Sequence, residues 1–312
     1  MIVSDYENEI RSGFNISSMM KRVWAVQLDI LSEIRCICEK YGLSWWIEGG
    51  SMLGAVREKG YIPWDDDMDI AMHRLDWEKF LRYAAKELPA GLFIANANLQ
   101  ERDDLVFCVK CGGCIPPDNA YLEAHHGCPY PVGVDIFVYD NIPDDPDERD
   151  AYIAVFSHAF TAGKEAPAGM LYDSLSEDLR RLVDKTIELT GAKFDKDKPV
   201  KGQMFYLADR IAAMYFDADT EYMAVTPYLP LNNKLVFKRQ YFNETVLMPF
   251  ETEVLPVPIE YEKVLSIWYG DDYMVPKREG ADHEYPYFGK FEDQLQKWYI
   301  EHDMTFPEEF RA

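Results

Sequence analysis

The spacing of hydrophobic residues predicts alternating helices and strands in the first part of the chain. From Ile16 to Tyr41, apolar residues recur at steps of three and four among charged ones, which predicts a long helix that stops at Gly42. Leu43–Glu48 predicts a short strand. The small residues Gly49–Ser51 then predict a turn that opens into a short helix at residues 52–57.

The same criteria predict three more strands and one amphipathic helix before residue 141. The strands are expected at residues 67–72, 106–110 and 132–139, and the helix at residues 75–88.

Beyond Asn141 the pattern changes. Prolines and acidic residues predict a linker, and most of the remaining chain predicts helices. Ser174 and Glu177 resemble a capping box at the start of the first of these helices. The helices are expected at residues 174–189, 202–216 and 261–268.

These elements predict an α/β (α+β) fold, with a mixed-sheet core at residues 1–142 and a mostly helical region at residues 143–312. Of the 312 residues, 48% are hydrophobic, which is enough for a substantial core. The net charge of 32 − 55 = −23 disfavours nucleic acid as a partner. With neither a secretory signal nor an apolar run of about 20 residues, the chain is expected in the cytoplasm, or peripheral to the inner membrane face.

Carboxylates provide the main candidate chemistry. Asp67 and Asp69 are two residues apart in a predicted strand, so their side chains are expected on the same face of the sheet. Neighbouring carboxylates repel, and a divalent cation such as Mg²⁺ (or Mn²⁺) relieves this repulsion. Asp135 lies on the polar side of an otherwise apolar strand and is expected to complete the site, with Asp65 as an outer ligand.

A calcium-binding loop is the competing explanation for these acids. Asp65, Asp67 and Asp69 match its first three ligand positions. Its sixth position requires glycine for a sharp turn and is Ile70 here, which excludes that motif.

Residues upstream of these acids are suited to bind phosphate. The backbone of Gly50 and the hydroxyl of Ser51 lie at a predicted strand-to-helix turn, where N–H groups can hold phosphate oxygens. Arg57 and Lys59 follow and could neutralise further phosphate charge.

A cluster of cysteines and histidines is a candidate structural Zn²⁺ site, although its spacing is irregular and buried thiols are the simpler explanation. Its members are Cys108, Cys111, Cys114, His125, His126 and Cys128.

Two segments resemble the LicD family, which includes bacterial phosphocholine transferases and the fukutin-related proteins. They are residues 48–57 (Glu-Gly-Gly-Ser-Met-Leu-Gly-Ala-Val-Arg) and residues 61–70 (Tyr-Ile-Pro-Trp-Asp-Asp-Asp-Met-Asp-Ile). Residues 134–137 resemble the second block of the family, and parts of residues 250–276 a third.

This resemblance implies a nucleotidyltransferase-like core, with the helical region completing the active-site cleft. It also implies that Asp67, Asp69 and Asp135 are the catalytic and metal-binding acids. The implied reaction moves a phosphoalcohol, phosphocholine first, from a CDP-alcohol such as CDP-choline to a glycan or lipid-linked glycan hydroxyl. Two alternatives remain: a nucleotidyltransferase that moves NMP from an NTP, and a catalytically silent glycan-binding scaffold.

Overall fold

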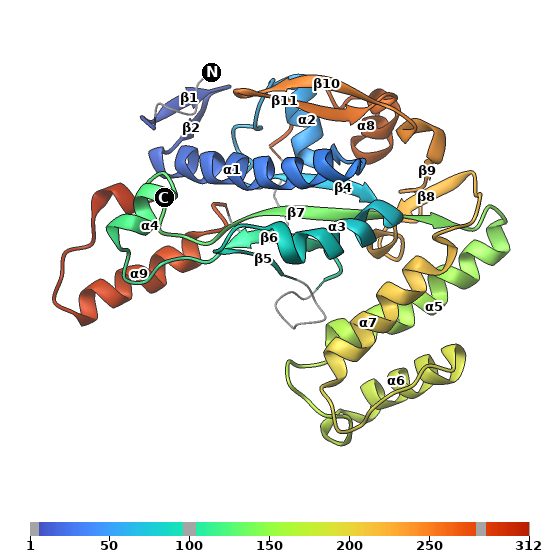
Figure 1. Ribbon diagram of the computed structural model, residues 1–312. Coiled ribbons are helices and arrows are strands. Elements are labelled where there is room, and N and C mark those ends of the chain that lie inside the picture. The colour runs from blue at the N-terminus through green and yellow to red at the C-terminus, as the bar shows by residue number, and fades with distance from the viewer. Residues whose placement is uncertain (1–5, 96–103, 279–284, 312) are drawn as a thin grey trace.

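A seven-stranded mixed sheet forms the centre of the protein (Figure 1). The computed structural model describes residues 6–95, 104–278 and 285–311. Five strands lie in the order β3-β4-β7-β6-β5, while β8 pairs with β7 and β9 with β8. The strands are β3 (Trp46–Ile47), β4 (Asp69–His73), β5 (Leu92–Ala95), β6 (Phe107–Cys111), β7 (Val132–Ile142), β8 (Tyr222–Val225) and β9 (Phe237–Lys238).

The long strand β7 organises this sheet. One edge pairs in parallel with β4, and the other pairs antiparallel with β6 and then, further along, with β8. Val134, Ile136 and Val138 are buried on one face of β7, as the sequence predicts. The intervening residues therefore face the opposite side of the sheet.

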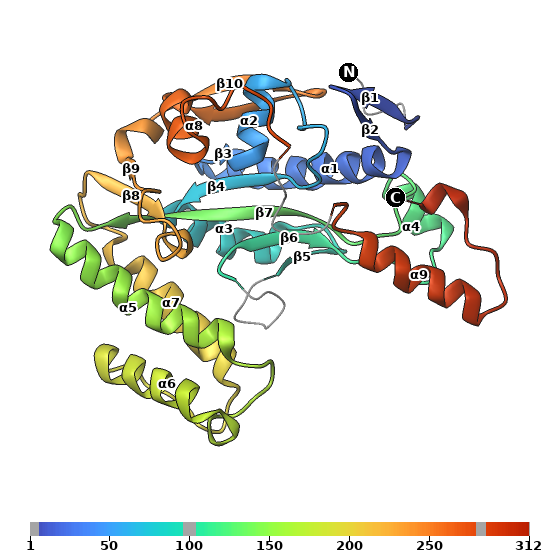
Figure 2. The ribbon, with the colours of Figure 1, turned by 180° about the vertical axis from the view of Figure 1, so that it is seen from behind.

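Helix α1 (Ser18–Tyr41) and helix α3 (Arg74–Glu87) contact each other and β7. The hydroxyl of Ser17 accepts a hydrogen bond from the Met20 amide at the start of α1, and Gly42 ends the helix with φ of 62°. The predicted long helix is thus confirmed. Figure 2, seen from behind, places α3 on the far side of the sheet.

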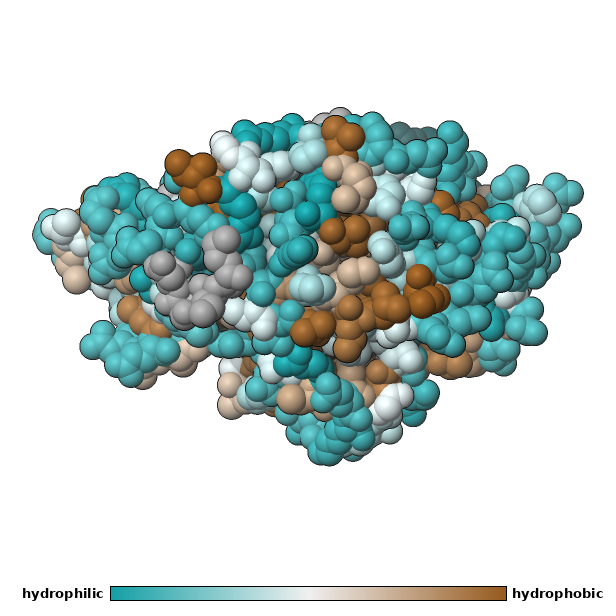
Figure 3. Space-filling model, turned by 90° about the horizontal axis from the view of Figure 1, so that it is seen from above, coloured by the Kyte–Doolittle hydropathy of each residue, from teal (hydrophilic) through white to brown (hydrophobic). Residues whose placement is uncertain are grey.

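A second layer lies above the sheet in Figure 1. The hairpin of β10 (Thr245–Phe250) and β11 (Glu253–Pro258) packs with α2 (Gly49–Arg57) and α8 (Tyr261–Tyr269). The small hairpin of β1 (Glu9–Arg11) and β2 (Phe14–Ile16) lies nearby. From above, this surface is mostly hydrophilic, with a few hydrophobic residues near its centre (Figure 3).

Three helices project below the sheet in Figure 1: α5 (Pro146–Glu165), α6 (Glu177–Thr190) and α7 (Val200–Ala212). At the opposite end lie α4 (Asn119–Ala124) and α9 (Gly289–Glu301). Among the described residues, no helix is both long and apolar enough to cross a membrane.

A buried ion network ties the projecting helices to the sheet. Arg74 Nε donates to Asp140 Oδ1 at 2.7 Å, and Arg74 Nη1 donates to Asp209 Oδ1 at 2.8 Å. Thr226 Oγ1 donates to Asp140 Oδ2 at 3.0 Å. These contacts join α3, β7 and α7 through polar groups that are hydrogen-bonded despite burial.

Several predicted boundaries are wrong. Helix α2 begins at Gly49 rather than Met52, because the glycines form its first turn. Strand β4 begins at Asp69, so Asp67 precedes the strand. Ser176, not Ser174, caps α6 by accepting from the Leu179 amide.

The predicted linker after Asn141 is also wrong in part, because Pro146 is already the first residue of α5. The mostly helical second half is confirmed, although it also holds β8 to β11, which the hydrophobic pattern does not predict. The boundary between residues 142 and 143 stays a prediction, and β8 and β9 continue the central sheet beyond it.

Candidate active site

The acidic loop before β4 is held by its neighbours on two sides. The Trp24 indole Nε1 donates to the Asp65 carbonyl at 3.3 Å, and Gln27 Nε2 donates to the Asp66 carbonyl at 2.9 Å. The Tyr287 amide donates to Asp66 Oδ2 at 2.6 Å. Asp66 is 1% exposed, so its carboxylate anchors the loop from within the core.

Two further acids lie on neighbouring strands of the sheet. Asp69 and Asp135 are direct partners in the parallel pairing of β4 and β7, so their side chains lie on one face. The Ser51 hydroxyl accepts a hydrogen bond from the Asp69 amide at 2.9 Å, and the Asp135 amide donates to the Met68 carbonyl at 2.9 Å. The start of α2 and the loop therefore fix both residues.

The acids lie close together and influence one another. Ligand oxygens of Asp65, Asp66 and Asp67 lie within 4.8 Å of each other. Burial, and then the Asp67 carboxylate, raises the pKa of Asp65 well above its usual range. The pKa of Asp69 is also raised well above its usual range, first by burial and then by the carboxylates of Asp67, Asp135 and Asp65.

This arrangement fits a divalent cation. Neighbouring carboxylates here oppose one another's ionisation, so a bound cation would favour their charged forms. Hard oxygen donors of this kind suit Mg²⁺ or Mn²⁺. Asp65, Asp67, Asp69 and Asp135 are the residues that would hold it.

Glu48 adds a buried acid at the start of α2. Trp46 Nε1 donates to its Oε2 at 2.8 Å and the Tyr139 hydroxyl donates to its Oε1 at 2.9 Å. Burial raises the pKa of Glu48 to about 7 despite these two donors.

A cavity of about 450 Å³, which we name the aromatic cavity, opens on one side of the acids. It contains two of the predicted phosphate-binding residues, Gly50 and Arg57, together with Asp65. A Cβ on Gly50 would lie 2.5 Å from Asp65 Oδ2, so only glycine permits this approach. Its remaining lining residues include Leu53, Ile62, Trp64, Trp268, Tyr269, Tyr273, Val275 and Lys277.

A second cavity of about 280 Å³, which we name the sheet cavity, reaches the acids from β6, β7 and the start of α9. It contains Asp67 and Asp135. In Figure 2 the beginning of α9 lies beside β6 and β7, on the side of the sheet away from α3. The remaining residues that line the sheet cavity are Gln27, Met68, Cys108, Lys110, Pro131, Val132, Gly133, Tyr287 and Phe291.

Two predicted phosphate-binding residues lie elsewhere. The Ser51 hydroxyl is buried against the Asp69 amide, so its contact positions an acid and lines neither cavity. Lys59 is exposed in the loop after α2 and lines neither cavity. A larger cavity of about 540 Å³ lies at the far end of β4, around His73 and Arg239, and contains none of the candidate acids.

The zinc candidates are not gathered at one point. Cys108 and Cys111 are three residues apart in β6, so they point to opposite faces of the sheet. His126 is held between Asp29 and the Tyr6 hydroxyl, both at 2.7 Å. His125 Nδ1 lies 2.8 Å from the Tyr121 carbonyl.

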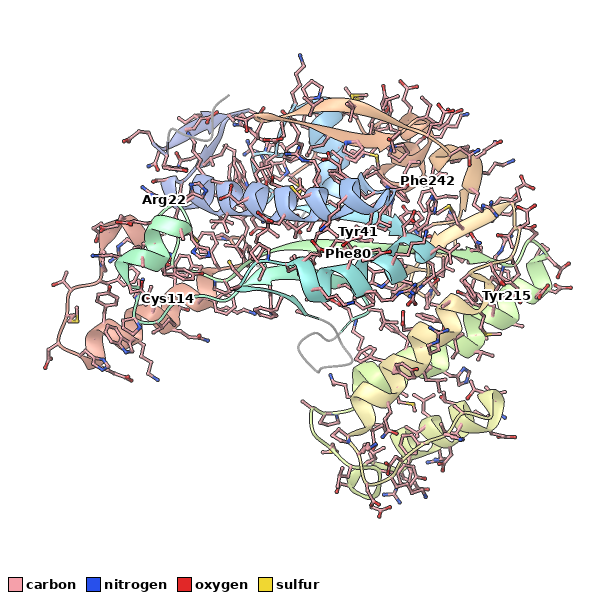
Figure 4. All side chains as sticks on the ribbon, viewed as in Figure 1. Arg22, Tyr41, Phe80, Cys114, Tyr215 and Phe242 are labelled. Atoms are coloured by element: carbon pink, nitrogen blue, oxygen red, sulfur yellow. The ribbon has the colours of Figure 1, made fainter. Side chains whose placement is uncertain are left out.

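The remaining two cysteines also have local contacts. The Cys128 thiol is buried and donates to the Tyr130 carbonyl at 3.9 Å. Cys114 lies beside α4, at the same end of the molecule as Arg22 (Figure 4), and its thiol donates to the Pro116 carbonyl at 3.0 Å. Within the described part of the chain, the acids at 65–67 form the only group of three or more side chains with metal-ligand spacing.

Four residues beside the acids are not among the site residues predicted from the sequence: Gln27, Lys110, Tyr269 and Tyr287. For Gln27 a signal exists: it is an uncharged polar residue on the apolar face of a helix, and it is 1% exposed. For Tyr269 there is also a signal, because it lies in the segment at residues 250–276 that resembles the third family block. Tyr287 and Lys110 come from distant segments with no pattern that connects them to the acids. Only the fold brings them to the site.

Comparisons with known proteins identify similar sequences. The family model described as "LicD/FKTN/FKRP, nucleotidyltransferase domain" matches residues 42–103, which include the acidic loop and Asp69. The lipopolysaccharide cholinephosphotransferase LicD of Haemophilus influenzae is 25% identical over 268 residues, covering 81% of this chain and 91% of that protein.

A shorter match involves an animal protein. The ribitol 5-phosphate transferase FKRP of Homo sapiens is 45% identical over 40 residues, covering 13% of this chain and 8% of that protein. Residues 42–103 therefore match the LicD family, which confirms the family resemblance predicted from the sequence.

Proposed function

We propose that this protein is a metal-dependent phosphotransferase that moves a phosphoalcohol group from a CDP-alcohol to a glycan hydroxyl. The observation that carries the proposal is a group of acids beside two cavities. Asp65 lines one cavity and Asp67 the other, their carboxylate oxygens lie within 4.8 Å of each other, and the paired Asp69 and Asp135 lie on the adjacent strands. Both named relatives are, by their names, transferases of a phosphoalcohol, cholinephosphate in one and ribitol 5-phosphate in the other.

The alcohol that we propose is choline. The relative that covers most of the chain carries the name of a cholinephosphotransferase, whereas the ribitol phosphate transferase matches a short segment. The acceptor is a glycan or lipid-linked glycan, consistent with the lipopolysaccharide in the name of that same relative.

The donor fits the aromatic cavity. Arg57 lines it and can neutralise diphosphate oxygens, while the Gly50 backbone permits close approach. The aromatic rings around it can stack on a nucleobase or contact a quaternary ammonium group. When bound, Mg²⁺ or Mn²⁺ would supply positive charge that stabilises the charge developing on the CMP leaving group.

The transfer exchanges one P–O bond for another. The acceptor oxygen bonds to the phosphorus that carries the alcohol, and the bond from that phosphorus to the CMP oxygen breaks. We assign Asp135 as the base that takes the hydroxyl proton, because it lies on the sheet face of Asp69 and lines the sheet cavity. The products are the glycan phosphodiester and CMP.

Differential scanning fluorimetry with and without Mg²⁺ tests the proposal against CDP-choline, CDP-ribitol, CDP-glycerol, CTP and ATP. A ligand at 100 times its dissociation constant stabilises the fold by about 2.7 kcal/mol, which gives a measurable melting shift. A magnesium-dependent shift that is larger with CDP-choline than with CTP supports the proposal. A shift with an NTP alone indicates a nucleotidyltransferase, and no shift with any nucleotide indicates a silent scaffold.

A further inference from the structure

We propose that the sheet cavity is the acceptor subsite and binds one sugar ring of the glycan, with Phe291, Tyr287, Lys110 and Gln27 as its binding residues. This assignment rests on the proposed function. It specifies where the acceptor lies and which side chains select it.

The position of the acids between the cavities supports this assignment. In phosphoryl transfer the attacking and leaving oxygens lie roughly in line on opposite sides of the phosphorus. The nucleotide and the acceptor must therefore approach the acids from different sides. Asp65 lines the aromatic cavity and Asp67 lines the sheet cavity, with their carboxylate oxygens within 4.8 Å of each other.

The lining of the sheet cavity suits a sugar rather than a nucleotide. Phe291 and Tyr287 offer apolar ring surfaces against which the C–H groups of a pyranose can pack. Lys110 is its one Lys or Arg side chain among the described lining residues, and it can donate to sugar hydroxyls. A volume of about 280 Å³ is at the small end of ligand sites and suits a single ring.

Gln27 provides independent support for a polar ligand. Its Nε2 donates to the Asp66 carbonyl at 2.9 Å, which fixes the orientation of the amide. Its Oε1 is buried and has no hydrogen-bond partner within the described part of the chain. A buried hydrogen-bond acceptor without a donor destabilises the fold. A sugar hydroxyl in the cavity could donate to this oxygen.

The walls of the cavity are rigid. The Tyr287 amide donates to Asp66 Oδ2 at 2.6 Å and its hydroxyl donates to the Pro131 carbonyl at 3.0 Å, so its ring has a fixed position. A Cβ on Gly133 would clash with Cys108 Sγ, so the Cys108 side chain packs directly over this glycine. A preformed cavity of this kind reduces the entropy lost on binding.

Ligand-observed saturation-transfer NMR tests the assignment with the methyl glycosides of glucose, galactose, N-acetylglucosamine and N-acetylgalactosamine. We expect wild type to bind at least one of them. Phe291→Ala and Lys110→Met should weaken that binding about ten-fold while the affinity for CDP-choline with Mg²⁺ stays unchanged. Arg57→Met should weaken CDP-choline binding and leave the glycoside unaffected.

Matched controls separate this effect from loss of fold. Phe306→Ala removes a half-buried ring near the C-terminus, and Lys86→Met removes an exposed lysine on α3; neither residue lines the cavity. Both controls should bind glycoside and donor as wild type does.

Two outcomes would overturn the inference and leave the proposed function intact. One is CDP-choline binding with no detectable glycoside binding. The other is loss of donor binding, with retained glycoside binding, in Phe291→Ala and Lys110→Met. Glycoside binding without binding of any CDP-alcohol would instead contradict the proposed function and leave the sugar site standing.

Discussion

Asp69 and Asp135 lie directly opposite one another where β4 and β7 run in parallel, although they are far apart in the sequence. Because they face the same side of the sheet, each adds negative charge to the surroundings of the other. The pairing therefore fixes the spacing of two acids through backbone hydrogen bonds rather than through flexible loops.

Replacing either acid by its amide should stop the reaction without unfolding the protein. We expect Asp135→Asn to lower kcat by about 10²-fold to 10⁴-fold, the range for loss of a general base. Asp69→Asn should weaken cation binding and lower kcat with it. A radiolabelled transfer assay from CDP-choline measures the loss. Asp217→Asn, at an exposed position, is the control, and wild-type turnover in both site variants would refute the assignment.

The same change at Asp69 should stabilise the metal-free protein. Its folded pKa is raised, so above the ordinary aspartate pKa the group ionises more readily in the unfolded state, which lowers the stability of the fold, and the amide removes that effect. In EDTA at pH 7.5 we expect a higher melting temperature for Asp69→Asn than for wild type. The difference should disappear as the pH falls below the ordinary aspartate pKa of about 3.9, where the wild-type group is protonated in both states.

Gly50→Ala should disturb Asp65 specifically. Its new methyl group would meet Asp65 Oδ2 at 2.5 Å, so the carboxylate must move away from the aromatic cavity. We expect a fold of near-wild-type stability and a clear fall in kcat/KM for the CDP-alcohol. Gly112→Ala, where a Cβ meets nothing within 4 Å, serves as the control and should behave as wild type.

Glu48 should make stability depend on pH. Its folded pKa of about 7 lies above the usual glutamate value, so its protonated form is favoured in the fold, and stability decreases as the pH rises from about 4.5 to about 7. The stability lost across this range is roughly 3 kcal/mol, because a tenfold change in proton affinity is worth about 1.4 kcal/mol.

Urea unfolding of wild type and Glu48→Gln in EDTA at pH 5 and pH 8 measures this contribution. Glutamine can still accept from Trp46 Nε1 and can donate to the Tyr139 hydroxyl, so its variant should lose less stability at pH 8. Glu188→Gln is the exposed control. If wild type and Glu48→Gln lose the same free energy of unfolding between pH 5 and pH 8, Glu48 does not titrate in this range.

The buried pair of Arg74 and Asp140 should matter far more than a surface pair. Asp140→Ala leaves the Arg74 guanidinium buried with fewer partners, and we expect a loss of about 3–5 kcal/mol in the free energy of unfolding. Asp178→Ala removes an Asp–Arg contact of 2.8 Å between exposed residues and should change stability by less than about 1 kcal/mol. Chemical denaturation compares the two, and equal effects would contradict the proposed role of the buried network.

Much of the fold is local in origin, and the sequence predicts that part well. The helix at residues 18–41 is confirmed because its apolar spacing, its cap at Ser17 and its stop at Gly42 all act within a few residues. The helix at Arg74–Glu87 and strand β7 are confirmed for the same reason. Strands β8 and β9 are short, and β8 depends on pairing with β7, which is distant in the sequence, so periodicity alone does not reveal them. Strands β10 and β11 form a local hairpin that the hydrophobic periodicity also does not reveal.

The sequence by itself determined the resemblance to the LicD family, the α/β class and the choice of candidate acids, because short motifs and hydrophobic spacing are local features of the chain. Only the tertiary structure decided how those acids meet. In the structure Asp67 precedes the strand, and the Ser51 hydroxyl accepts from the Asp69 amide. Cys108 and Cys111 point to opposite faces of the sheet. The tertiary structure also brought Gln27 and Tyr287 to the acidic loop, because side chains from distant segments become neighbours only when the sheet and helices pack into one core.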